Sequence, residues 1–244
     1  MRWNKFAHPA SRTAIVFCAL LLFAAGPRRQ LPQESQPAPE INQAHSTATP
    51  FVMIDPGHGG DDNGAVLSDK LLEKDLTLAL ARRLKAELQE KGITARLLRD
   101  ADVTLSLEQR AETANEQHAA LYVVLHAGMP GRGIRVYSPA NVSPGVAAAG
   151  KFLPWDNAQA NYLSRSQALA TAVAGALARK NLTVSTLSTP LRPLNNINAP
   201  AIAVELAIDP ADLQDIVGQK FQTAVASGIA AEIAQQRSQW EKQP

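Results

Sequence analysis

The sequence predicts an α/β fold, a three-layer α/β/α domain with a mostly parallel sheet, on the strength of three observations. Short apolar segments typical of strands alternate with helix-like segments from Phe51 to about Trp240. The longest helix-like segment repeats leucine every four residues and ends at a glycine. The region, about 190 residues long, is sufficient for one hydrophobic core. Such alternation is typical of βαβ units, whose helices cover the faces of a parallel sheet.

The individual elements follow from local patterns. The first apolar segment, FVMID, is short and bounded by Pro and Gly, as expected for a buried strand. In residues 71–92, Leu76, Leu80, Leu84 and Leu88 share one helical face, and Gly92 is a helix stop. Further strands are expected at 93–99, 120–125, 133–138 and 201–206, and further helices at 105–118, 163–181 and 218–240.

The first 50 residues differ in kind from the rest. Residues 1–26 combine a basic start with an uncharged, mostly apolar run, residues 13–26, which is typical of a secretory signal. As a helix this run rises roughly 21 Å, less than the roughly 30 Å of a bilayer core, although an uncleaved signal anchor stays an alternative. Residues 27–50 are rich in Pro, Gln and Ser and predict a flexible linker. We therefore expect an exported protein of the periplasm or cell envelope, with 51–244 as its folded domain; residues 13–26 would tether it to the membrane only in the alternative of an uncleaved anchor.

Composition excludes several function classes. The formal net charge is +2, and the folded part has no basic run, so nucleic acid is not an expected partner. Cys18 is the only cysteine, which excludes an internal disulfide framework and a cysteine-based zinc finger.

Four polar residues stand where ligands bind in α/β sheets, outside the carboxyl ends of the strands. His58 follows the first strand, His126 and Glu205 end two later strands, and Glu73 begins the long helix. Two histidines and two carboxylates are the donor set of a zinc hydrolase, in which three residues hold the metal and a carboxylate accepts a proton. The sequence therefore predicts a zinc site at this edge of the sheet.

Each of these residues also has a simpler explanation. His58 fits an ordinary glycine-rich turn, and Glu73 suits any helix N-terminus because of the helix dipole. His126 fits a hydrogen-bonded core histidine. Glu205 is the least ordinary, because a carboxylate within an apolar strand is costly to bury without a partner.

The motifs IDPGHGGDDNGA, EKDLTLALARRL, LLRDAD, LSLEQRAETAN, LYVVLHA and PAIAVELA occur together and in this order. In this combination the chain resembles the zinc-dependent N-acetylmuramoyl-L-alanine amidases, the amidase 3 family of bacterial cell-wall enzymes, from about Phe51 to Ala234. The resemblance implies one Zn²⁺ bound by His58, Glu73 and His126, with Glu205 as the catalytic residue. It also implies hydrolysis of the amide between N-acetylmuramic acid and L-alanine in peptidoglycan, and it leaves open an activator protein.

The chain departs from the family pattern beside the second histidine. Val124 and Gly128 occupy places where the family commonly has Ser and Asn. Arg99 and Arg110 match family positions, and we expect them to have structural rather than catalytic roles. Two alternative functions stay open: an inactive peptidoglycan-binding or regulatory relative, and a zinc peptidase with a different amide specificity.

Overall fold

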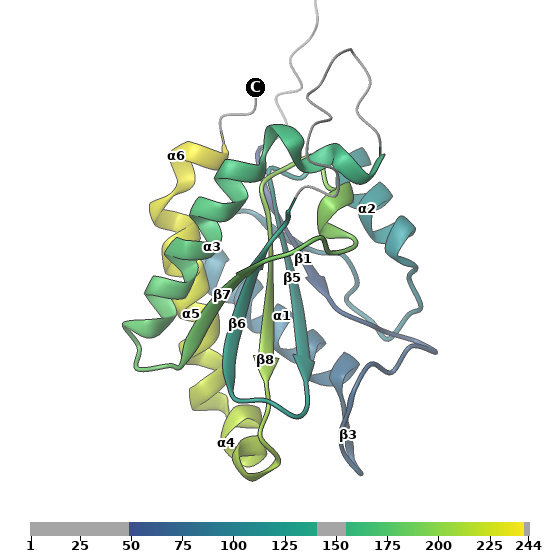
Figure 1. The fold of residues 1–244 in the computed structure, drawn as a ribbon, viewed down its shortest axis with the longest axis vertical. Helices are drawn as coiled ribbons and strands as arrows, with labels where there is room; N and C mark the ends of the chain where they lie inside the picture. Colours follow the sequence, from purple (N-terminus) through teal and green to yellow (C-terminus); the bar gives the residue numbers. More distant parts are fainter. Residues whose placement is uncertain (1–48, 141–154, 242–244) are drawn as a thin grey trace, which may run out of the picture. The chain divides into compact units, whose positions relative to one another are not determined.

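The computed structural model describes residues 49–140 and 155–241, and within them a mixed sheet is flanked by helices (Figure 1). The expected signal segment 1–26 and nearly all of the expected linker 27–50 lie outside the described residues. Among the described helices, none combines the length and apolarity needed to cross a membrane.

The main sheet has six strands in the order β4-β1-β5-β8-β6-β7. Four of its five strand pairs are parallel, and only β6 and β8 pair antiparallel, which confirms the mostly parallel sheet. A short antiparallel pair, β2 and β3, leads into the first helix. The strands are β1 (Val52–Pro56), β2 (Val66–Ser68), β3 (Leu71–Leu72), β4 (Ala95–Leu97), β5 (Leu121–Gly128), β6 (Gly133–Ser138), β7 (Val184–Ser188) and β8 (Ala201–Ala207).

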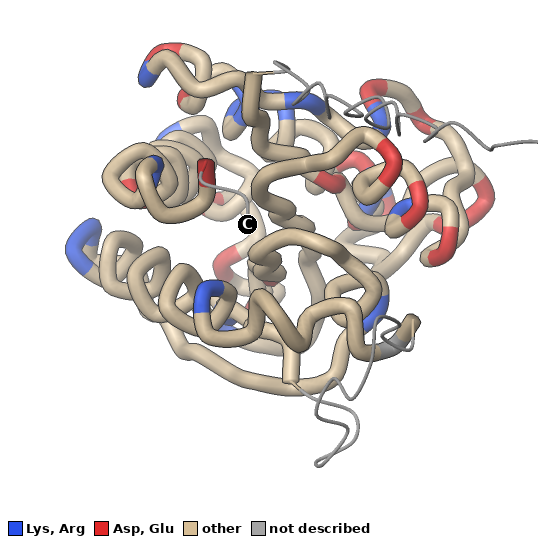
Figure 2. Tube along the Cα trace, turned by 90° about the horizontal axis from the view of Figure 1, so that it is seen from above, with Lys and Arg blue, Asp and Glu red and all other residues tan. Residues whose placement is uncertain are grey.

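Helices cover both faces of the sheet and make the expected three layers. Helices α1, α3 and α5 pack on one face, with α5 in contact with both α1 and α3, and α2 lies on the other face with η2 (Figure 1). Viewed from above, acidic positions gather on the side that carries α2 (Figure 2). The helices are α1 (Glu73–Glu90), α2 (Leu107–Glu116), α3 (Leu163–Ala178), α4 (Leu213–Val217), α5 (Gln219–Gln235) and α6 (Arg237–Trp240), and the 3₁₀ helices are η1 (Trp155–Asn161), η2 (Leu194–Asn196) and η3 (Pro210–Asp212).

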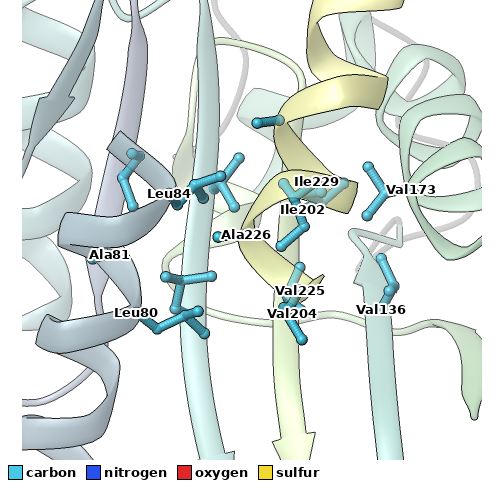
Figure 3. Close-up of a cluster of buried hydrophobic side chains, with 14 of the residues drawn as sticks. Leu80, Ala81, Leu84, Val136, Val173, Ile202, Val204, Val225, Ala226 and Ile229 are labelled. Atoms are coloured by element: carbon cyan, nitrogen blue, oxygen red, sulfur yellow. The ribbon is translucent and has the colours of Figure 1, made fainter. Parts of the chain in front are cut away.

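The larger core lies between the sheet and the α1, α3 and α5 layer (Figure 3). The leucines of α1 that repeat every four residues are all buried there, because that spacing keeps them on one helical face. Strand β8 alternates, so that Ile202 and Val204 enter this core while Ala203 and Glu205 face the α2 side. This alternation places the expected catalytic glutamate on the more thinly covered face.

Four strands differ from the sequence-based expectation: the short strands β2 and β3 were not predicted, and β3 includes Leu71–Leu72, which were expected to begin the first helix. Strand β7 was not predicted, because VSTLS has little apolar content and most of this edge strand is exposed. Strand β4 spans only Ala95–Leu97 of the expected 93–99, and these three residues pair with the first three residues of β1.

Candidate metal and hydrolase site

The four predicted site residues converge at the carboxyl ends of β1, β5 and β8. His58 lies two residues beyond β1, and Glu73 is the first residue of α1. His126 and Glu205 stand opposite each other in the register of β5 and β8. All four line one cavity of about 330 Å³. The four side chains therefore converge at the edge of the sheet where the sequence predicts them.

Three of these side chains form a compact cluster. His58 Nε2 lies 3.2 Å from Glu73 Oε2, and His126 Nδ1 lies 2.9 Å from Glu73 Oε1. The two imidazole rings are nearly perpendicular, with centroids 5.1 Å apart. One donor atom from each residue lies within 4.8 Å of the other two. These distances suit joint ligation of one metal ion.

Glu73 is fixed by backbone as well as by the two histidines. The backbone N–H groups of Ala65 and Ala127 donate to its two carboxylate oxygens at 2.8 and 3.0 Å. Burial alone would raise the pKa of Glu73, but the hydrogen bonds with His126, His58 and these N–H groups outweigh it and hold the pKa well below its usual range. Glu73 is therefore an anion in a defined orientation.

Asp62 orients His58, and sequence reasoning missed it. Its Oδ2 lies 2.8 Å from His58 Nδ1, which leaves Nε2 toward Glu73. Its other oxygen accepts from the backbone N–H of Gly64 at 3.1 Å, and its backbone pairs with Gly59 in both directions. Hydrogen bonds to Glu73 and then to Asp62 raise the pKa of His58 despite its partial burial. A carboxylate on the far nitrogen of a ligating histidine is a common partner in metal sites. The four-residue spacing in the glycine-rich turn was the available signal.

The glycines beside His58 allow the close approach of several chain segments. A Cβ at Gly57 would come within 2.6 Å of His126 Cε1, and one at Gly64 would come within 2.6 Å of both Glu73 Oε2 and the His58 ring. Gly64 also has φ of +64°, which side chains rarely adopt. The bare backbone of this loop is therefore needed to bring the cluster together.

Two buried arginines, Arg99 and Arg110, hydrogen-bond to the backbone of the loop that carries His58. Arg99 donates to the carbonyls of Pro56 and Gly57, and Arg110 donates to those of Pro56 and His58. Arg110 also forms a buried ion pair with Asp55. These contacts support the expected structural role of both arginines, because the guanidinium groups tie down the carbonyls around His58.

Asp55 itself is fully buried beneath the site. Its carboxylate accepts hydrogen bonds from Arg110 and from the hydroxyl of Tyr122. Burial raises the pKa of Asp55, and these two partners oppose the shift. The contacts of Asp55 with Arg110 and Tyr122 join β1, β5 and α2 where the loop that carries His58 leaves the sheet.

Glu205 lies beside the cluster and is held by two side chains of β6. Tyr137 donates its hydroxyl to Glu205 Oε2 at 2.6 Å, and Arg135 Nη1 donates to Oε1 at 3.2 Å. The half-buried carboxylate of Glu205 thus has two hydrogen-bond partners. Sequence reasoning did not single out Arg135; its place two residues before Tyr137, on the same strand face, was the available signal.

The two departures from the family pattern have different surroundings. Val124 is buried in the apolar layer under α2. A Cβ at Gly128 would lie 3.4 Å from Glu205 Oε1, an ordinary contact distance. Position 128 therefore borders the carboxylate, and glycine there leaves space beside Glu205.

The donor set fits zinc. Zinc binds imidazole nitrogen and carboxylate oxygen at about 2.0–2.2 Å, and tetrahedral geometry then keeps its ligand atoms roughly 3.4 Å apart. The distances of 3.2 Å from His58 Nε2 to Glu73 Oε2 and 2.9 Å from His126 Nδ1 to Glu73 Oε1 are each near that spacing, although they end on different oxygens. Asp62 also supplies the partner that such a histidine commonly has.

An α/β domain with two histidines and two carboxylates at one sheet edge has the layout of a metal-dependent hydrolase. Comparison with known proteins gives the family: the sequence profile of the N-acetylmuramoyl-L-alanine amidases matches residues 52–235. The chain belongs to this family, the amidase 3 family.

Individual relatives agree with this placement. Amidase AmiC of Escherichia coli O6:H1 is 37% identical over 100 residues, which cover 41% of this chain and 24% of AmiC. The chain thus matches only about a quarter of that relative's length. Among solved structures, AmiC2 of Nostoc punctiforme has a TM-score of 0.63 at 26% identity, over 78% of this chain and 98% of that one. The catalytic domain of CwlV from Bacillus (Paenibacillus) polymyxa has a TM-score of 0.60 at 27% identity, with the same coverage.

Proposed function

We propose that this protein hydrolyses the amide bond between N-acetylmuramic acid and L-alanine in peptidoglycan, using one Zn²⁺ held by His58, Glu73 and His126. The observation that carries the proposal is the shared cavity, in which these three donors lie beside Glu205. Membership of the amidase family supports the substrate. Export to the cell envelope, membrane tethering through residues 13–26 and an activator protein stay predictions.

Glu205 is the proton carrier of this proposal. When bound, zinc supplies Lewis acidity, which polarises the scissile carbonyl and makes water more acidic. Glu205 accepts a proton from the attacking water and passes it to the nitrogen of L-alanine as the carbon–nitrogen bond breaks. Tyr137 and Arg135 hold one oxygen of Glu205 each, so the carboxylate is oriented before substrate binds.

The roles of metal and base are separated by substitution of Glu205. We expect the full-length Glu205→Gln protein to bind zinc with about the stoichiometry of the parent and to lose hydrolysis of purified sacculi, because an amide cannot accept the proton. Glu90→Gln, at the exposed end of α1, is the matched control and should keep both properties. Full activity of Glu205→Gln would exclude the assigned role.

Product mass spectrometry on sacculi separates this function from its alternatives. Release of intact stem peptides that begin with L-alanine is expected. Fragments cut within the peptide would instead indicate a zinc peptidase. Binding to sacculi without any product would indicate an inactive, peptidoglycan-binding relative.

A further inference from the structure

Arg135 hydrogen-bonds to Glu205 through Nη1 alone, and the proposed amide hydrolysis gives the rest of its guanidinium group no role. It stands directly opposite Glu205 in the register of β6 and β8, and Glu205 stands directly opposite His126. The three residues therefore form a row across neighbouring strands that are about 4.8 Å apart. In this row His126, a proposed metal ligand, is at one end, Glu205, the proposed base, is in the middle, and the cationic Arg135 is at the other end.

The guanidinium group of Arg135 is held but not enclosed. Its Nη1 bonds to Glu205, and its side chain is 35% exposed. A Cβ at Gly131 would come within 3.1 Å of its Nη2, so the glycine leaves room beside the group. Among the described residues, Glu205 is the only carboxylate that forms an ion pair with Arg135. Because a guanidinium carries five N–H donors in a planar fork, it retains donors for a second carboxylate.

The order His126, Glu205, Arg135 along the row indicates which part of a bound substrate would lie beside Arg135. This step rests on the proposed function. The scissile carbonyl belongs at the His126 end, and the amide nitrogen must lie near Glu205 to receive its proton. The chain that continues from that nitrogen is the stem peptide, so it runs past Glu205 toward Arg135. One residue advances the peptide by about 3.8 Å, which brings the residue after L-alanine to the guanidinium.

We propose that Arg135 is a specificity residue that binds a free carboxylate on the stem-peptide residue following L-alanine. On this path an anionic peptide passes the carboxylate of Glu205, which repels it. Arg135 offsets that repulsion on the peptide side. The substrate class is therefore a muramoyl peptide whose second residue is an unamidated acid.

Two matched substrates test this assignment. They are muramoyl-L-alanyl-γ-D-glutamyl-L-lysine, whose second residue keeps a free α-carboxylate, and muramoyl-L-alanyl-D-isoglutaminyl-L-lysine, in which that carboxylate is an amide. We expect the full-length zinc-loaded protein to prefer the acid, and Arg135→Gln to raise KM for the acid roughly tenfold to a hundredfold, as for loss of a charged hydrogen bond. The ratio of kcat/KM between acid and amide should fall toward one in this variant, and Arg135→Lys should restore part of the preference.

Arg132→Gln is the control, because it removes the same charge from the neighbouring exposed arginine, which pairs with Asp209 instead. It should leave the preference for the acid unchanged. An equal loss for acid and amide in Arg135→Gln would overturn the proposal, since Arg135 would then act only through Glu205. Loss of the preference in Arg192→Gln, at the cavity wall, but not in Arg135→Gln would also overturn it. If the unmodified protein cleaved neither compound nor sacculi, the proposed amidase function itself would fail.

Discussion

Replacing Asp62 with asparagine tests whether this carboxylate prepares His58 for metal binding. In the folded protein the His58 Nδ1–Asp62 bond of 2.8 Å directs Nε2 toward Glu73. Partners of this kind typically contribute tenfold to a hundredfold to metal affinity. Because the Asp62 side chain is 60% exposed, water weakens the bond, and we expect the lower end: about a tenfold loss of zinc affinity, or about 1.4 kcal/mol.

Competition with a chromophoric chelator at neutral pH measures this loss, and thermal unfolding of the metal-free protein gives the structural control. Asparagine keeps an oxygen that can accept from Gly64, so the metal-free variant should unfold close to the parent. Asp61→Asn removes the same charge from the next residue, which is exposed, and should keep the parent's zinc affinity. Equal affinity losses in the two variants would refute the orientation argument, because they would reflect net charge alone.

Two further substitutions address the fold. Leu84→Ala should lower the free energy of unfolding by about 2–5 kcal/mol, because Leu84 is fully buried. Leu187 is 42% exposed on β7, so Leu187→Ala should change the free energy of unfolding by less than about 0.5 kcal/mol. Similar losses for the two variants in urea titrations would contradict the assigned core. The hydrogen bond from Lys74 lowers the pKa of Asp102, so its stabilisation is present above the unfolded pKa of about 3.9 and is lost as pH falls through the folded value. The difference in unfolding free energy between the parent and Asp102→Asn should therefore shrink on acidification, and a growing difference would be inconsistent with the ion pair.

Sequence periodicity was sufficient for most of the fold. The four-residue leucine repeat fixed α1 because one helical face must enter the core. Apolar runs located β1, β5 and β8, since central parallel strands are buried on both faces. Periodicity could not find β7, where Thr186 and other exposed residues replace the apolar pattern, nor could it show that β6 runs antiparallel to β8.

The convergence of the four candidate residues was predictable, and the partners of their side chains were less so. His58 follows a strand, and His126 and Glu205 lie near the carboxyl ends of two others, where α/β sheets bind ligands. Asp62 and Arg135 were not predicted, because an acidic residue in a turn and an arginine on a half-exposed strand are common without function. Their roles depend on which atoms meet across segments far apart in sequence.

The alternation of β6 links Glu205 to the hydrophobic core. Ile134 and Val136 are buried on the helix-covered face, which turns Arg135 and Tyr137 toward Glu205. A one-residue slip of this strand would exchange the two pairs and expose both core side chains, at a cost of roughly 3–6 kcal/mol. Two aliphatic core residues therefore align the side chains that hold Glu205, and polar substitutions at these positions would displace Arg135 and Tyr137 on the opposite face of the sheet.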